Sequence, residues 1–138
     1  MEILPANARA ALAGRKVVLV KPPFGMPTPE AYGLLARSGR YRAAAQAEAE
    51  LVAWLASPDA DPSALGNDLA APVFAKYLAL PVGLASFRQN AGLNGQMTGS
   101  GSACFGFVSD GFDHARLRAD VRRAWGLGAW VEETVISG

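Results

Sequence analysis

The sequence predicts an α+β fold in a single domain, with an antiparallel sheet covered on one face by helices. The chain has 138 residues, a length that fits one compact domain. Short apolar segments typical of strands lie towards both ends, and helical segments gather between them. Strands separated in this way by a block of helices are expected to meet in one sheet that the helices cover.

The first strand is expected at Lys16–Val20, because KVVLV is short, apolar and rich in β-branched residues. The next segment, Lys21–Thr28, contains three prolines and a glycine. It is expected to be a loop, because proline fixes φ and lacks an amide donor. Thr28 followed by Pro29 predicts a helix N-cap and first helical residue, with the helix ending near Arg37.

The middle of the chain is expected to hold two further helices. Tyr41–Leu55 is alanine-rich and carries apolar side chains at roughly helical spacing. A longer helical stretch, from Leu69 to about Asn90, follows Asp68, which is placed to cap it. Because Pro81 and Gly83 fall inside this stretch, we expect it to be kinked or split there.

The last third of the chain alternates between strands and a helix. Met97–Phe107, MTGSGSACFGF, reads as a glycine-serine loop that leads into a buried strand over Ala103–Ser109. A charged amphipathic helix is expected at Asp113–Trp125, and a final strand at Ala129–Ile136.

Composition and charge narrow the classes of function. The net charge is +1, so electrostatics give no reason to expect binding to nucleic acid or to an anionic membrane. The single cysteine excludes an internal disulfide and favours a reducing, cytoplasmic location. No stretch approaches the roughly 18 apolar residues that a membrane-spanning helix needs.

The glycine-serine loop is the first candidate for a functional site. Gly99, Ser100, Gly101 and Ser102 offer backbone N–H groups that no large side chain obstructs, and such turns can bind anions. The alternative is a simple turn before a strand. The loop is not a Walker A motif, because no Gly-Lys-Ser/Thr follows and a strand is expected next.

The proline-rich segment Lys21–Tyr32 is the second candidate. Prolines reduce the entropy lost when a loop is ordered, which suits a loop that holds a ligand. Tyr32 lies one turn into the following helix, where its ring could stack on a ligand; the alternative is that it packs in the core. Among the remaining reactive residues, His114 is expected at the surface and Cys104 inside a buried strand.

Three segments, taken in their order and spacing, resemble one family. They are VLVKPPFGMPTPEAY (Val18–Tyr32), NDLAAPVF (Asn67–Phe74) and MTGSGSACFGF (Met97–Phe107). Together they resemble the carboxyl-terminal domain of the GHMP small-molecule kinases, over nearly the whole chain. Within this superfamily they are most similar to the kinases that phosphorylate the 2-hydroxyl of 4-diphosphocytidyl-2-C-methyl-D-erythritol in non-mevalonate isoprenoid biosynthesis. The fold implied by the resemblance is ferredoxin-like, with a four-stranded antiparallel sheet covered by helices.

The resemblance also implies roles for particular residues. Gly99, Ser100, Gly101 and Ser102 fall on the superfamily's third motif, which lies beside the phosphate-binding loop and helps to shape the phosphate-transfer site; the resemblance thus implies that they are cofactor-binding residues, with ATP as the cofactor. Thr28, Pro29 and Tyr32 fall on the segment that lines the cytidine pocket, where an aromatic ring stacks on cytosine. Asn67 and Asp68 match the family pattern, and we interpret them as helix caps.

The resemblance implies that residues 1–138 form the carboxyl-terminal domain alone. No segment matches the family's ATP phosphate loop, so the catalytic groups, ATP and Mg²⁺ are expected to be bound mainly by an amino-terminal domain, and no catalytic residue or metal ligand is assigned to these residues. The chain alone is expected to be inactive, and the surface that would face the other domain is expected to favour dimerisation. The alternatives are a homoserine or mevalonate-type kinase of the same superfamily, or a free-standing ligand-binding or regulatory module.

Overall fold

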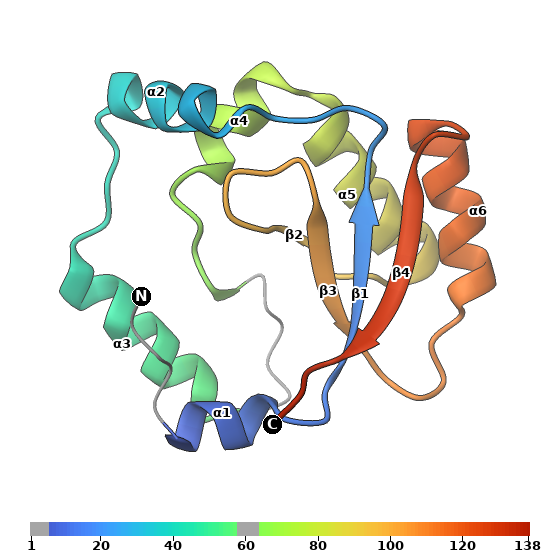
Figure 1. The fold of residues 1–138 in the computed structure, drawn as a ribbon, viewed down its shortest axis with the longest axis horizontal. Helices are drawn as coiled ribbons and strands as arrows, with labels where there is room; N and C mark the ends of the chain where they lie inside the picture. Colours follow the sequence, from blue (N-terminus) through green and yellow to red (C-terminus); the bar gives the residue numbers. More distant parts are fainter. Residues whose placement is uncertain (1–5, 58–63) are drawn as a thin grey trace.

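The computed structural model describes residues 6–57 and 64–138, which form a four-stranded antiparallel sheet and six helices (Figure 1). In chain order the elements are α1 (Ala6–Leu12), β1 (Lys16–Lys21), α2 (Thr28–Ser38), α3 (Ala44–Leu55), α4 (Ala70–Lys76), α5 (Ala79–Ala91), β2 (Gln96–Met97), β3 (Cys104–Val108), α6 (His114–Trp125) and β4 (Trp130–Val135). The strand order is β2-β3-β1-β4. A β-α-β-β-α-β order with antiparallel neighbours is ferredoxin-like, so the predicted fold class is confirmed.

One face of the sheet forms the hydrophobic core. Val18 and Val20 of the central strand β1 are fully buried, and the antiparallel register sets them opposite Gly106 and Cys104 of β3. Helices α5 and α6 pack against each other over this face, as Figure 1 shows behind the strands. Val18 and Val20 share this face because the strand period is two residues, and Val17, which points to the other face, is also buried.

Close packing between α5 and α6 depends on a glycine. A Cβ at Gly83 of α5 would lie 2.4 Å from Nε1 of Trp125 on α6. The Trp125 ring meets Phe87 edge to face at a centroid distance of 4.8 Å, and its Nε1–H donates to the carbonyl of Ala79 at 2.8 Å. The indole is therefore fixed on two sides, and the two helices approach each other at Gly83.

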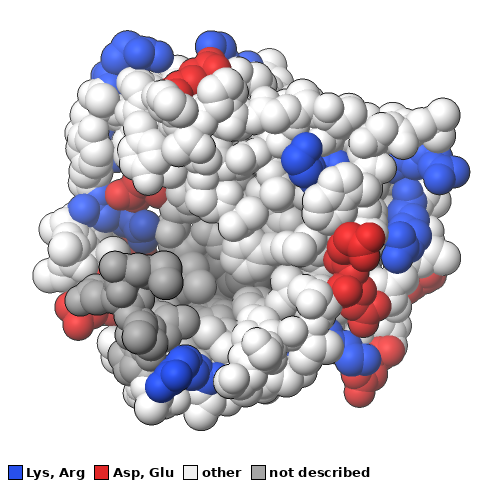
Figure 2. Space-filling model, viewed as in Figure 1, with Lys and Arg blue, Asp and Glu red and all other residues white. Residues whose placement is uncertain are grey.

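The other face of the sheet is partly covered, which corrects the prediction of a sheet covered on one face alone. The buried ring of Trp54, on α3, stacks on Phe107 of β3 at a centroid distance of 5.7 Å. The guanidinium of Arg15 lies 3.9 Å from the centre of the same Phe107 ring. Figure 2 shows that the molecule is hollowed on the face in view, and that mainly uncharged side chains line the hollow.

The long helical stretch predicted over Leu69–Asn90 is broken earlier than expected. Helices α4 and α5 meet at Tyr77 and Leu78 with a bend of 105°. Pro81 is the third residue of α5, in the first turn, where its missing N–H leaves no hydrogen bond unmade. In an unbroken helix the N–H of residue 81 would bond to the carbonyl of Tyr77, so Pro81 splits the stretch at Tyr77, four residues before itself. Gly83 lies within α5 and does not break it.

Three predicted helix starts also need correction. The second helix begins at Ala44 and not at Tyr41. Helix α2 has Pro27 at its N-cap, so Thr28 is the first helical residue and does not cap it. Asp68 does not cap α4, because its carboxylate is bound to Arg42. Neither α1 nor the two-residue strand β2 was predicted from the sequence.

Two backbone hydrogen bonds join the start of β1 to the end of β4. The N–H of Gly14 donates to the carbonyl of Ile136, and the N–H of Ile136 donates to the carbonyl of Arg15. This junction lies at one end of the sheet, and the loop between β2 and β3 lies at the other (Figure 1).

Within the described residues no single helix is long and apolar enough to cross a membrane. Helices α4 and α5 reach the required length and apolarity only as a pair, and a bend of 105° separates them.

Candidate functional site

The glycine-serine loop, residues 98–103, connects β2 to β3. It closes on itself through two backbone hydrogen bonds, from Thr98 N–H to the Ala103 carbonyl and from Gly101 N–H to the Thr98 carbonyl. Gly99 has φ +53° and Gly101 has φ +84°. Because this left-handed region disfavours residues with a Cβ, the loop requires glycine at both positions.

The proline-rich segment and the first turn of α2 both form hydrogen bonds with the loop. The hydroxyls of Thr28 and Ser100 lie 3.2 Å apart, close enough for a hydrogen bond. Ser102 is buried, and its hydroxyl donates to the Phe24 carbonyl at 2.5 Å. Two of the segments that resemble the kinase family, 72 residues apart at the Thr28–Ser100 contact, are thus in direct contact.

Asn67 links the remaining segment of the resemblance, Asn67–Phe74, to the same loop. Its Nδ2 donates to the carbonyl of Met97 at 3.0 Å and to the carbonyl of Gly99 at 2.9 Å. Its Oδ1 accepts the N–H of Leu69 at 3.0 Å. The interpretation of Asn67 as a cap is therefore correct only for Oδ1, and its bonds to the loop were not predicted.

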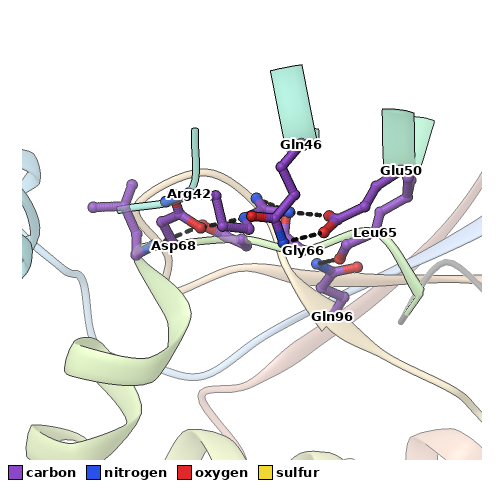
Figure 3. Close-up of polar contacts among 9 residues, drawn as sticks. Arg42, Gln46, Glu50, Leu65, Gly66, Asp68 and Gln96 are labelled. Carbon is purple, nitrogen blue, oxygen red and sulfur yellow. Dashed lines mark hydrogen bonds and ion pairs between the residues drawn. The ribbon is translucent and has the colours of Figure 1, made fainter. Parts of the chain in front are cut away.

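A polar cluster on the other side of Asn67 holds residues 66–68 in place (Figure 3). The N–H and side chain of Arg42 donate to the Asp68 carboxylate, and its guanidinium also pairs with Glu50 of α3 and donates to the Gly66 carbonyl. The hydrogen bond from the Arg42 backbone, and next that from its side chain, lower the pKa of Asp68. The Asp68 carboxylate therefore has a structural role.

The first turn of α2 is fixed by a carboxylate that faces α4. Both oxygens of Glu30 accept from the Tyr77 hydroxyl at 3.1 Å, and Lys76 forms an ion pair with the same carboxylate. The hydrogen bond from Lys76 is the main cause of a lowered pKa for Glu30. The Phe24 ring stacks on Tyr77 at 5.9 Å, so the loop before α2 is held by the same tyrosine.

Tyr32 is not part of the core. Its side chain is 58% exposed, which removes the interpretation of Tyr32 as a packing residue. It lies four residues after Thr28 in α2, so the two project from the same side of the helix. Pro29 is exposed in the same turn. The predicted substrate-binding residues thus lie on one exposed part of α2, and Thr28 connects that part to the glycine-serine loop.

The remaining reactive residues form no second site. Cys104 is fully buried, and burial raises the pKa of its thiol to about 12, as expected for a cysteine that acts as a small apolar residue. His114 is less exposed than predicted, because its Nε2 lies 3.0 Å from Glu133 of β4. Among the described residues, no group of three or more histidine, cysteine or acidic side chains is placed to hold a metal ion.

The fold and the three joined segments are similar to the carboxyl-terminal domain of the GHMP small-molecule kinases, which confirms the resemblance seen in the sequence. Among the solved structures, the chain matches a 4-(cytidine 5'-diphospho)-2C-methyl-D-erythritol kinase with 33% sequence identity and a TM-score of 0.61. The match covers 88% of this chain and 43% of that kinase chain, so the 138 residues span less than half the length of their relative. No protein-family model and no curated protein matches the chain.

Proposed function

We propose that this chain is the substrate-binding half of an ATP-dependent kinase that phosphorylates the 2-hydroxyl of 4-diphosphocytidyl-2-C-methyl-D-erythritol. The observation that carries the proposal is the contact between Thr28, in the segment that the family resemblance assigns to substrate, and Ser100, in the segment that it assigns to phosphate. The similarity to a solved kinase of that specificity supports it, at 33% identity. The pathway, non-mevalonate isoprenoid biosynthesis, and a cytoplasmic location are parts of the same proposal.

The glycine-serine loop has donors that suit the phosphates of ATP. Among the described residues, the N–H groups of Gly99 and Ser100 have no hydrogen-bond acceptor. Free backbone N–H groups in a tight turn bind anionic oxygens, and they cost no reorganisation when charge develops there. The proposal assigns Gly99, Ser100, Gly101 and Ser102 to phosphate binding: Gly99 and Ser100 offer the free N–H groups, and Gly101 and Ser102 hold the loop through bonds to Thr98 and Phe24. No Mg²⁺ ligand is assigned to the described residues, and the proposal leaves the ion to the rest of the kinase.

The exposed turn of α2 is assigned to the cytidine part of the substrate. Tyr32 offers an exposed ring on which a base can stack, and base stacking on an aromatic side chain contributes about 1–3 kcal/mol. Thr28 and Pro29 border it in the same turn. Because Thr28 also contacts Ser100, these residues would orient the acceptor alcohol relative to the phosphate-binding loop, as phosphoryl transfer requires.

The test is an assay of the complete polypeptide from which this chain derives. With ATP, Mg²⁺ and radiolabelled γ-phosphate, it should transfer phosphate to the cytidyl-erythritol alcohol and not to homoserine or mevalonate. Transfer to either of those instead would assign the chain to another GHMP kinase and overturn the substrate. A natural reading frame that encodes these residues alone, with no transfer, would favour a ligand-binding module.

The isolated chain provides a second measurement. We expect it to be inactive, because the proposal places the catalytic groups in another domain. Large apolar side chains, among them Leu127, Val82 and Leu78, are 64–81% exposed, so sedimentation of the chain alone is expected to show self-association at high concentration. Catalysis by the isolated chain would contradict the proposal that the catalytic groups lie in another domain.

A further inference from the structure

The amide of Asn67 uses every hydrogen-bonding atom it has. Nδ2 donates to the carbonyl of Met97, the last residue of β2, and to that of Gly99 in the glycine-serine loop, both within 3.0 Å. The remaining atom, Oδ1, is held by the N–H of Leu69. Since Oδ1 can only accept and Nδ2 can only donate, this arrangement fits an asparagine and no isosteric residue.

The contact with Gly99 sets the direction of a neighbouring donor. In a trans peptide the C=O and the N–H point in opposite directions, and the Gly99–Ser100 peptide is trans. Because Asn67 draws the Gly99 carbonyl towards itself, the Ser100 N–H points away from Asn67. That N–H is among the loop donors that lack an acceptor within the described residues.

Asn67 is itself held on both sides. Arg42 binds the carbonyl of Gly66 before it and the carboxylate of Asp68 after it, as Figure 3 shows for these labelled residues. Leu69, whose N–H bonds to Oδ1, is buried in the core. The amide is therefore a fixed point from which the position of the loop is set.

We infer that Asn67 is a positioning residue, which holds the glycine-serine loop so that the Ser100 N–H is directed at a phosphate group. The inference rests on the proposed function and adds to it a residue that the sequence alone suggested only as a helix cap. Asn67 does not touch the phosphate; it acts through the Gly99–Ser100 peptide.

The test replaces the donor and keeps the shape. Asn67→Asp retains an acceptor for Leu69 but puts an oxygen in place of Nδ2, opposite two carbonyls. The matched control is Asn7→Asp, the same change at an exposed position of α1. In the complete kinase, Asn67→Asp should raise the KM for ATP about tenfold, which corresponds to the roughly 1.4 kcal/mol of one good hydrogen bond, and leave the acceptor KM unchanged.

This pattern separates positioning from a loss of folded protein. A smaller folded fraction lowers the apparent kcat and leaves both KM values as they were. Lowering the pH should reduce the ATP KM of the Asn67→Asp variant, because a protonated carboxyl regains one donor. Unchanged KM for ATP, or an equal effect of Asn7→Asp, would overturn the inference.

A second arm does not depend on catalysis. In ¹⁵N-correlated NMR spectra of this chain, millimolar tripolyphosphate should shift the amide resonances of Gly99 and Ser100, and Asn67→Asp should weaken the binding about tenfold. If the complete polypeptide phosphorylates no alcohol, the proposed function fails, and this titration alone decides the role of Asn67. Equal shifts in both proteins, or none in the unmodified chain, would refute it.

Discussion

The hydroxyls of Thr28 and Ser100 lie 3.2 Å apart, although 72 positions separate the two residues in the sequence. The contact connects the first turn of α2 to the loop between β2 and β3. It is exposed, so its contribution to the stability of the folded chain is small, of the order of 1 kcal/mol or less. Its value lies in fixing the distance between the two proposed binding surfaces.

Removing the Thr28 hydroxyl should therefore affect transfer more than folding. In the complete kinase, we expect Thr28→Val to lower kcat/KM for the alcohol about tenfold, while the midpoint of thermal unfolding shifts by no more than roughly 4 °C. Thr134→Val, the same change at an exposed position of β4, is the control. Equal losses of rate in the two variants would contradict a role for the contact.

Substituting the exposed aromatic residue of α2 tests the proposed cytidine surface. Tyr32→Ala should raise the KM for the cytidyl substrate at least tenfold, because stacking on the base is lost, and Tyr32→Phe should not. Neither change should alter the free energy of unfolding by more than about 0.5 kcal/mol, since the ring is exposed. Tyr41→Ala, at 61% exposure, is the matched control. A KM that Tyr32→Ala leaves unchanged would remove the residue from the site.

The approach of α5 to α6 can be tested by adding one methyl group. Gly83→Ala should destabilise the chain by about 1–3 kcal/mol, because the new Cβ meets the fixed indole of Trp125. Gly33→Ala in α2 should instead stabilise it by up to about 1 kcal/mol, since only the flexible Arg37 side chain is near, at 3.4 Å. Urea unfolding of both variants measures the difference. A stabilising Gly83→Ala would show that Trp125 can move.

The carboxylate that ties α2 to α4 predicts sensitivity to acid. The pKa of Glu30 is lower in the folded chain than its ordinary value of 4.5, mainly through the hydrogen bond from Lys76. Its contribution to stability is therefore complete above about pH 4.5 and is lost as the pH falls through the lower, folded pKa. The unfolding free energy of the unmodified chain should fall more steeply below pH 4.5 than that of Glu30→Gln, whereas Glu48→Gln, on the exposed side of α3, should follow the unmodified chain.

Local patterns of the sequence were enough to predict the fold class. Strand β1 and helix α6 were located within a residue or two, because a β-branched apolar run and an amphipathic stretch after Asp113 are strong local signals. Strand β2 was not predicted, because a strand of two residues is too short to show an alternation of apolar and polar side chains. It is defined only by its pairing with β3. The proline at position 81 predicted the break between α4 and α5, which falls four residues earlier, at the Tyr77 carbonyl that Pro81 cannot bond to. The contacts of Tyr77 with Glu30 and Phe24 at this bend were not predictable from local sequence.

The candidate site was predictable in its parts and not in its connections. The glycines at positions 99 and 101 and the exposed Tyr32 were found from residue type and spacing. The bonds of Asn67 to the loop and of Ser102 to Phe24 join residues 30 and 78 positions apart, and a capping pattern carries no information about such a distant acceptor. Arg42 was missed for the same reason, since its partner Asp68 had a local explanation as a cap.

The junction of Gly14 and Arg15 with Ile136 determines how this domain can be attached to other polypeptides. The chain enters β1 from α1 and leaves β4 at the same corner, because two backbone hydrogen bonds hold these positions together. The register sets Lys16 opposite Val135 there, and Val20 opposite Cys104 at the far end of the sheet. A fusion partner, affinity tag or surface tether joined after β4 would therefore leave from the end of the sheet opposite the glycine-serine loop.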